Sequence, residues 1–136
     1  MSDVFITGLM AIIITQFIKT LIEYNKTGFF SLKMLFQNGG MPSSHVAAMT
    51  AVTGGILFEQ GVSALFGLSV ILTLIIINDA LKVRRQTGIQ AEIINKIMKI
   101  DHIQHERLTK NIGHTLSQVI VGAILGIVIS LLIYSI

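Results

Sequence analysis

The chain has 136 residues, of which 52% are hydrophobic and only 12% are charged, and its formal net charge is +3. A soluble domain carries about twice that share of charged residues, so the composition argues against an ordinary soluble fold and favours a membrane protein. The length allows one domain, residues 1–136, and the lack of cysteine excludes disulfides and thiolate chemistry. The sequence shows no basic face interleaved with aromatic residues, which nucleic-acid-binding proteins often have, so we expect no nucleic-acid partner.

Four apolar runs predict an all-α, polytopic membrane helix bundle with four transmembrane helices, at residues 4–22, 46–58, 64–77 and 112–136. A bilayer crossing needs roughly 20 residues, so we expect the short second helix to be tilted or to begin below the headgroups. Small residues dominate this second run, which predicts the most enclosed helix of the bundle. In the fourth run Gly122 and Gly126 have small-xxx-small spacing, which indicates close packing against another span or against a second copy in a homo-oligomer.

An additional helix is predicted between the third and fourth runs, at residues 88–108. Ile89, Ile93, Ile97 and Ile100 recur there at helical spacing, and polar residues fill much of the remainder. This pattern is typical of an amphipathic helix that lies in the membrane interface or packs beneath the spans.

The basic residues indicate how the chain is oriented in the cell membrane. All ten Lys and Arg residues fall near the first connection or between residues 82 and 110, and the turn at 59–61 holds none. Four crossings place both basic regions on one side of the bilayer. The positive-inside rule then predicts that this side is cytoplasmic and that both termini lie outside.

The segment at residues 39–45, GGMPSSH, is the first candidate for chemistry. Its glycines and proline predict a tight turn before a helix, and Ser43 or Ser44 is placed to cap that helix. A helix N-terminus offers free backbone N–H groups and a partial positive charge, which suit a phosphate, and His45 is placed to exchange a proton there. The alternative is a capped helix that merely has a histidine at the interface.

Two further groups of residues are expected at the same membrane level. His114, within Asn111-Ile112-Gly113-His114-Thr115, enters the fourth span there, and phosphoryl transfer requires both a nucleophile and an acid. Arg84 and Arg85 carry planar donors that fit phosphate oxygens, although positive-inside anchoring also explains them. Asp79 lies at the end of a span, where we expect it to pair with an arginine or to orient a histidine.

A metal site is not expected. Asp101, His102, His105 and Glu106 offer ligands on one face of the predicted amphipathic helix, but no cysteine or tight ligand set supports them. A solvated polar face is the favoured interpretation, and no cofactor is predicted.

Three segments in this order, GGMPSSH, NDALKVRRQTGIQAEIIN and GHTLSQVIVGAILG, closely resemble the divergent branch of the type 2 phosphatidic acid phosphatase superfamily. That superfamily also includes vanadium-dependent haloperoxidases, and the resemblance covers residues 16–126. It implies a metal-independent membrane phosphatase that acts on a lipid phosphate or pyrophosphate. By this resemblance His114 is the nucleophile that forms a phosphohistidine, His45 is the acid, and backbone amides near Ser43 hold the phosphate.

The sequence also departs from the superfamily pattern. Gln118 stands where a carboxylate usually orients the nucleophilic histidine, and Asp79 is a candidate substitute. Lys19 matches the lysine of the first motif, whose arginine and proline are missing, and Arg84 and Arg85 are candidates to supply guanidinium groups. Superfamily members tend to have six spans, against the four predicted here.

These observations leave alternative functions open. The first is a phosphatase for an isoprenoid or glycerolipid phosphate, which binds the phosphate with Lys19, Arg84, Arg85 and the amides at the helix start. The second is a weakly active or inactive homologue that binds or moves lipid phosphates. The third is a structural membrane subunit.

Overall fold

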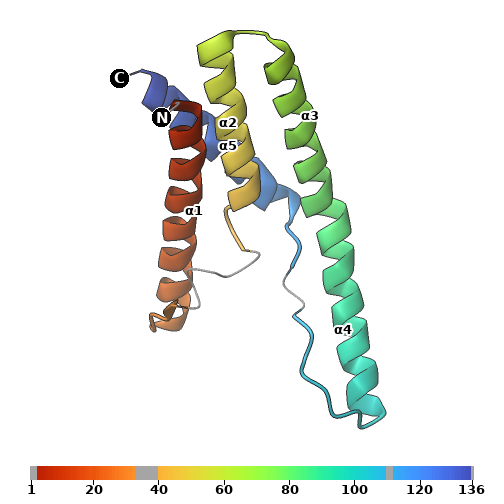
Figure 1. Cartoon of the computed structure of the whole chain (residues 1–136). Helices are drawn as coiled ribbons and strands as arrows, with labels where there is room; N and C mark the ends of the chain where they lie inside the picture. Colours follow the sequence, from red (N-terminus) through yellow and green to blue (C-terminus); the bar gives the residue numbers. More distant parts are fainter. Residues whose placement is uncertain (1–2, 33–39, 110–111, 136) are drawn as a thin grey trace.

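The computed structural model describes residues 3–32, 40–109 and 112–135, and these residues form helices and connections without a strand. The elements are α1 (Asp3–Thr27), α2 (Ser44–Gln60), α3 (Ala64–Asn78), the π-helical turn η2 (Asp79–Val83), α4 (Arg84–Ile100) and α5 (Leu116–Tyr134) (Figure 1). Gly39 and Asn111 of the predicted motifs, Lys33 and Lys110 of the basic regions, and Ile136 lie outside the described residues.

The structure confirms the predicted all-α membrane fold. Three helices are long and apolar enough to cross a bilayer: α1, the continuous helix of residues 64–100, and α5. Helix α2 has only 17 residues and packs against α1, α3 and α5. This central position agrees with the prediction that the second apolar run forms the most enclosed helix.

Small residues on α2 allow its neighbours to approach closely. Ala47 and Ala51 are fully buried. A Cβ atom added at Gly54 would clash with the side chain of Ser130 on α5. Gly55 similarly faces the backbone of Val4 on α1. The helices in lipid thus meet through small side chains, as expected where burial of apolar surface gives little driving force.

Helix α5 crosses α2 through its two spaced glycines. A Cβ atom at Gly122 would lie 2.6 Å from the carbonyl oxygen of Ser43, and one at Gly126 would clash with the carbonyl oxygen of Ala47. Of the two alternatives for this motif, packing within the chain is therefore the correct one. The face of α5 that carries these glycines is occupied by α2.

The amphipathic helix differs from its prediction in position and continuity. Helix α4 begins at Arg84 and ends at Ile100, whereas residues 88–108 were expected, and it continues α3 through η2 as one long rod (Figure 1). No proline or glycine lies between Asn78 and Arg84 to end the helix. After α4, His102 adopts a left-handed backbone with a φ of 52°. Residues 103–109 are not helical, and the Asn95 side chain bonds both backbone groups of Leu108, at 2.8 and 2.9 Å.

The start of α1 and the end of α5 lie at one end of the bundle, together with the connection between α2 and α3 (Figure 1). There the Glu59 carboxylate accepts hydrogen bonds from the Val4 amide, at 3.2 Å, and from the Tyr134 hydroxyl, at 2.7 Å. The start of α2 and the end of α3 lie toward the opposite end. The side of the membrane on which this end of the bundle lies stays a prediction.

Candidate functional site

The three sequence motifs meet at the end of the bundle opposite the termini. The Ser43 amide, just before α2, donates a hydrogen bond of 3.2 Å to the Gln118 carbonyl in the first turn of α5. The His114 amide, just before α5, donates one of 3.2 Å to the Ala80 carbonyl in η2. Backbone hydrogen bonds therefore join the residue before α2 to α5, and the segment before α5 to the π-helical turn.

A cavity of about 130 Å³ lies where these segments meet, and we call it the inner cavity. A single water needs about 10–15 Å³ of such space, so a polyatomic ligand of several atoms fits. Its lining residues come from α2, α3, η2, α4 and the segment before α5: Ser43, His45, Ile76, Asp79, Ala80, Arg84 and His114. The two histidines singled out in the sequence thus face one space.

His114 is the least satisfied polar side chain of the site. Only 5% of the residue is exposed, and neither Nδ1 nor Nε2 has a hydrogen-bond partner among the described residues. Burial, followed by the positive charge of Lys19, lowers the pKa of His114 to about 4. The imidazole is therefore neutral at pH 7, and one ring nitrogen holds the lone pair that a nucleophile requires.

His45 lies in the first turn of α2 and is more exposed than His114. His45 lines the inner cavity together with Arg84 and Asp79. A histidine in this position can exchange protons both with a ligand in the cavity and with water outside it. These are the properties that general acid and base catalysis requires.

Positive charge gathers around the two histidines. Lys19 of α1 is only 8% exposed, and its Nζ donates a hydrogen bond of 3.3 Å to the Ser44 hydroxyl. Across the described ranges no carboxylate forms an ion pair with Lys19. A buried cation with a neutral partner is costly, and an anion in the site would offset that cost.

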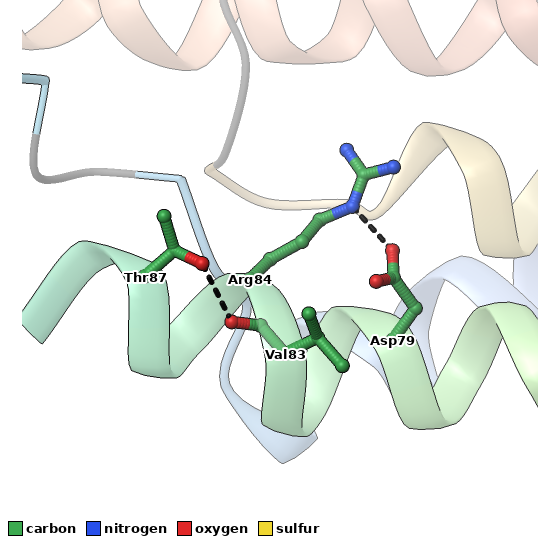
Figure 2. A network of polar contacts seen from close by, with 4 residues as sticks. All are labelled: Asp79, Val83, Arg84 and Thr87. Atoms are coloured by element: carbon green, nitrogen blue, oxygen red, sulfur yellow. Dashed lines mark hydrogen bonds and ion pairs between the residues drawn. The ribbon is translucent and has the colours of Figure 1, made fainter.

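Asp79, the first residue of η2, forms an ion pair with Arg84, the first residue of α4 (Figure 2). Of the two roles expected for Asp79, pairing with an arginine is therefore the one observed, and no hydrogen bond joins its carboxylate to a histidine among the described residues. The pair holds the Arg84 guanidinium at the inner cavity. Thr87, one turn farther along α4, bonds the Val83 carbonyl at 3.0 Å and does not take part.

Neither serine of the motif caps α2 through its side chain, which corrects the prediction. Ser43 occupies the N-cap position with an extended backbone but makes no capping hydrogen bond, and Ser44 is the first helical residue. Ser43 is fully buried against Gly122, and its hydroxyl has no partner among the described residues. Contact with α5 thus fixes Ser43, and Ser44 serves as the acceptor for Lys19.

Arg85 and Gln118 do not line the inner cavity. Both line a second, more open cavity of about 410 Å³, the outer cavity, which His114 also borders. The Gln118 side chain accepts a hydrogen bond of 3.0 Å from the Thr115 amide and completes a capping box at the start of α5. The two consecutive arginines therefore line different cavities.

Gly113 was not assigned a role from the sequence. A Cβ atom there would clash with the Cα atom of Arg85, so only glycine lets the segment before α5 reach α4. The only sign of this role in the sequence was the position of Gly113 beside His114.

The predicted ligand group at residues 101–106 is not on a helix face, because α4 ends at Ile100. Within the described ranges no three acidic, histidine or cysteine side chains gather as metal ligands would.

Comparison with known proteins gives two matches. A family model described as the divergent PAP2 family matches residues 1–129. The uncharacterized membrane protein YuiD of Bacillus subtilis (strain 168) is 33% identical over 144 residues, which cover 94% of this chain and 91% of the relative. No solved structure matches the chain.

Proposed function

Because the chain belongs to the divergent PAP2 family, as its motifs predicted, we propose that this membrane protein is a metal-independent phosphatase for a lipid phosphate or pyrophosphate. The observation that carries the proposal is the His114 side chain, whose two buried ring nitrogens lack partners at the wall of a cation-lined cavity. The lipid carrier is an isoprenoid or a glycerolipid, in keeping with a site at the end of apolar helices.

The proposed reaction has two steps. In the first, a ring nitrogen of His114 attacks phosphorus, the P–N bond forms, and the ester P–O bond breaks. His45 gives its proton to the departing oxygen. In the second, His45 takes a proton from water, whose oxygen attacks phosphorus while the P–N bond breaks and phosphate leaves.

Positive charge supports both steps. Arg84 presents a guanidinium to the inner cavity, and Lys19 adds a buried positive charge beside Ser44. These cations stabilise the charge that the phosphoryl oxygens carry in the transition state. The free amides at the start of α2 add donors and a partial positive charge. Fixed cations in a site of low dielectric supply what a metal ion supplies in other phosphatases.

A second candidate function is binding or moving lipid phosphates without turnover. One specific observation favours it. Asp79 is paired with Arg84 and Gln118 caps α5, so no described carboxylate orients the His114 ring. A carboxylate in that role stabilises the imidazolium charge that forms on attack, and its loss lowers the rate.

The test measures phosphate release by purified protein in detergent from a panel of lipid phosphates and pyrophosphates. The His114→Ala and His45→Ala variants remove the proposed nucleophile and acid, and His105→Ala removes an exposed histidine outside the site. We expect the wild type and His105→Ala to release phosphate, and His114→Ala and His45→Ala to release none. Phosphate binding without release in the folded wild type would instead establish the binding function.

The site is proposed to face the cytoplasm. All ten Lys and Arg residues fall in the sequence near the connection between α1 and α2 or between residues 82 and 110, which supports this orientation by the positive-inside rule. A homo-oligomer also remains a proposal, and its contact would use a surface other than the glycine face of α5.

A further inference from the structure

We propose that α4 is an interaction surface for a second copy of this chain. Four of its isoleucines form a row along the helix, which we call the isoleucine row: Ile89, Ile93, Ile97 and Ile100. The row of one copy packs against the row of the other, so that two α4 helices run parallel beyond the membrane. This surface is separate from both cavities' histidine wall and does not depend on the proposed phosphatase activity.

The charged and the apolar side chains of α4 lie on different sides of the helix. Consecutive residues of an α-helix are turned by about 100° about its axis, so sequence positions translate into sectors. The isoleucine row falls within a sector of about 80°. All charged residues of α4 fall within a separate sector of about 120°: Arg84, Arg85, Glu92, Lys96 and Lys99.

The charged sector is covered within the chain, whereas the isoleucine row stays exposed. The Asn95 side chain, in the charged sector, bonds the Leu108 backbone, and Arg107 borders a hollow together with Lys96 and Lys99. The members of the isoleucine row are 45% to 74% exposed. A continuous apolar strip in water favours association, because pairing removes its surface from the solvent.

Lipid does not cover the far end of this strip. Helices α3 and α4 are parts of one continuous helix, Ala64–Ile100, which starts at the end of the bundle that holds the start of α1 and the end of α5 (Figure 1). At about 1.5 Å per residue, Ile97 lies about 50 Å along this helix from Ala64. A bilayer with its headgroups is about 40–45 Å thick. A second copy in the same membrane, by contrast, extends its own α4 to the same height.

The membrane also fixes how two copies meet. Both copies cross it in the same direction, so their α4 helices are parallel and related by a two-fold axis along the membrane normal. In such a pair, each edge of the row meets the opposite edge of the row on the second copy. Lys96 flanks one edge, and the uncharged Gln90 and Ile94 flank the other. Each lysine therefore faces an uncharged edge, and the pair brings no like charges together.

Single-cysteine variants report this contact directly, because the chain has no cysteine of its own. In a parallel two-fold pair, a residue of the row lies opposite its own copy. Ile93→Cys and Ile100→Cys should therefore form disulfide-linked dimers when isolated membranes are mildly oxidised. Lys99→Cys, in the charged sector, is the matched control and should give about fivefold less dimer or lower, because a disulfide requires Cα atoms within about 7 Å.

A second measurement needs no cysteine. Light scattering of the wild type in detergent should give the mass of a dimer. Ile97→Glu should shift the mass to that of a monomer, because pairing would bury two carboxylates against each other. Lys99→Glu places the same side chain in the charged sector and should keep the dimer. Circular dichroism verifies that both variants retain the helix content of the wild type.

The remaining outcomes overturn the inference. Equal cross-linking of Ile93→Cys and Lys99→Cys would reflect random collision. Cross-linking of Ile93→Cys without that of Ile100→Cys would refute the parallel arrangement. A monomer mass for the wild type, with a fluorophore on the Ile100→Cys variant quenched by spin-labelled lipid, would show that the bilayer surface and not a second copy covers the row.

Discussion

The amide of Ser43 donates a hydrogen bond of 3.2 Å to the carbonyl of Gln118, and this bond joins the two segments that carry the candidate catalytic histidines. One turn along α5, Gly122 lies against the Ser43 carbonyl with no room for a side chain. The distance between His45 and His114 therefore depends on how closely α5 approaches α2. The contact between Gly122 and Ser43 therefore sets both the packing of the two helices and the geometry of the site.

Gly126→Leu should destabilise the fold. A side chain at this position clashes with the backbone and side chains of α2 and forces the two helices apart. Overpacking of this kind typically costs about 1–3 kcal/mol in the free energy of unfolding. Thermal unfolding in detergent, followed by circular dichroism, measures the change as a lower melting temperature.

Gly67→Leu is the matched control, because a Cβ atom there meets nothing within 4 Å. It should leave the melting temperature close to that of wild type. Equal losses in the two variants would contradict the assigned packing role. Gly126→Leu should also leave the oligomeric state of the folded fraction unchanged, because its face already contacts α2 within the chain.

Much of the fold could be predicted from the sequence because the bilayer imposes simple constraints. Long apolar runs must be helical to satisfy their backbone groups, and small residues mark close helix contacts. His45 and His114 could be placed near each other because both lie at helix starts on the same side of the membrane. The structure brings both to the inner cavity.

The hydrophobic periodicity of the sequence does not predict where the side chains of Arg84, Arg85 and Gln118 lie, because their positions depend on local three-dimensional contacts. A π-helical turn at Asp79–Val83 keeps α3 and α4 continuous and rotates Arg84 into the inner cavity. Arg85, one residue later, faces a different space. Gln118 matches the position of a family carboxylate, but local capping of α5 determines where its side chain points.

Stability should depend on pH through His114. Its pKa of about 4 in the folded protein lies below the ordinary 6.5, so the unfolded chain binds the proton more readily. The contribution to stability is therefore complete above pH 6.5 and is lost as the pH falls toward 4. The shift corresponds to about 3 kcal/mol. Melting temperatures of wild type and His114→Gln at pH 7.5 and 4.5 measure it.

Other groups titrate in both proteins, so the difference between them isolates His114. Wild type should lose more stability than His114→Gln on acidification. Parallel losses over this range would show that His114 is not held neutral by its surroundings. His105→Ala, which removes an exposed histidine, should behave like wild type.

The predicted topology can be tested with reporters. A reporter fused to the C-terminus should read as non-cytoplasmic, because the end of α5 lies at the bundle end away from the basic connections (Figure 1). A reporter inserted into the exposed segment at residues 103–109 should read as cytoplasmic and serves as the internal control. Two reporters on the same side would refute this arrangement.

Gln118→Ala should lower the unfolding free energy by about 1 kcal/mol, because it removes half of the capping box at the start of α5. Gln118→Glu should keep most of the stability, since glutamate is equally suited to the third helical position of such a box. Thermal unfolding of both variants at pH 7.5 provides the comparison. Equal stability of Gln118→Ala and wild type would mean that the cap contributes nothing.

Orthovanadate should bind the site and inhibit any phosphatase activity. Vanadate bonded to a histidine nitrogen resembles pentacoordinate phosphorus, and His114 presents unpartnered, unprotonated nitrogen beside the Arg84 guanidinium at pH 7. Vanadium NMR of protein in detergent should show a bound species that His114→Ala abolishes. Arg84→Gln should weaken binding by about tenfold or more, because it removes a charge-assisted hydrogen bond.

Lys99→Gln should bind vanadate as the wild type does, since this exposed lysine lies away from the cavity. Bound vanadate that persists in His114→Ala would place the anion elsewhere and refute the nucleophile assignment.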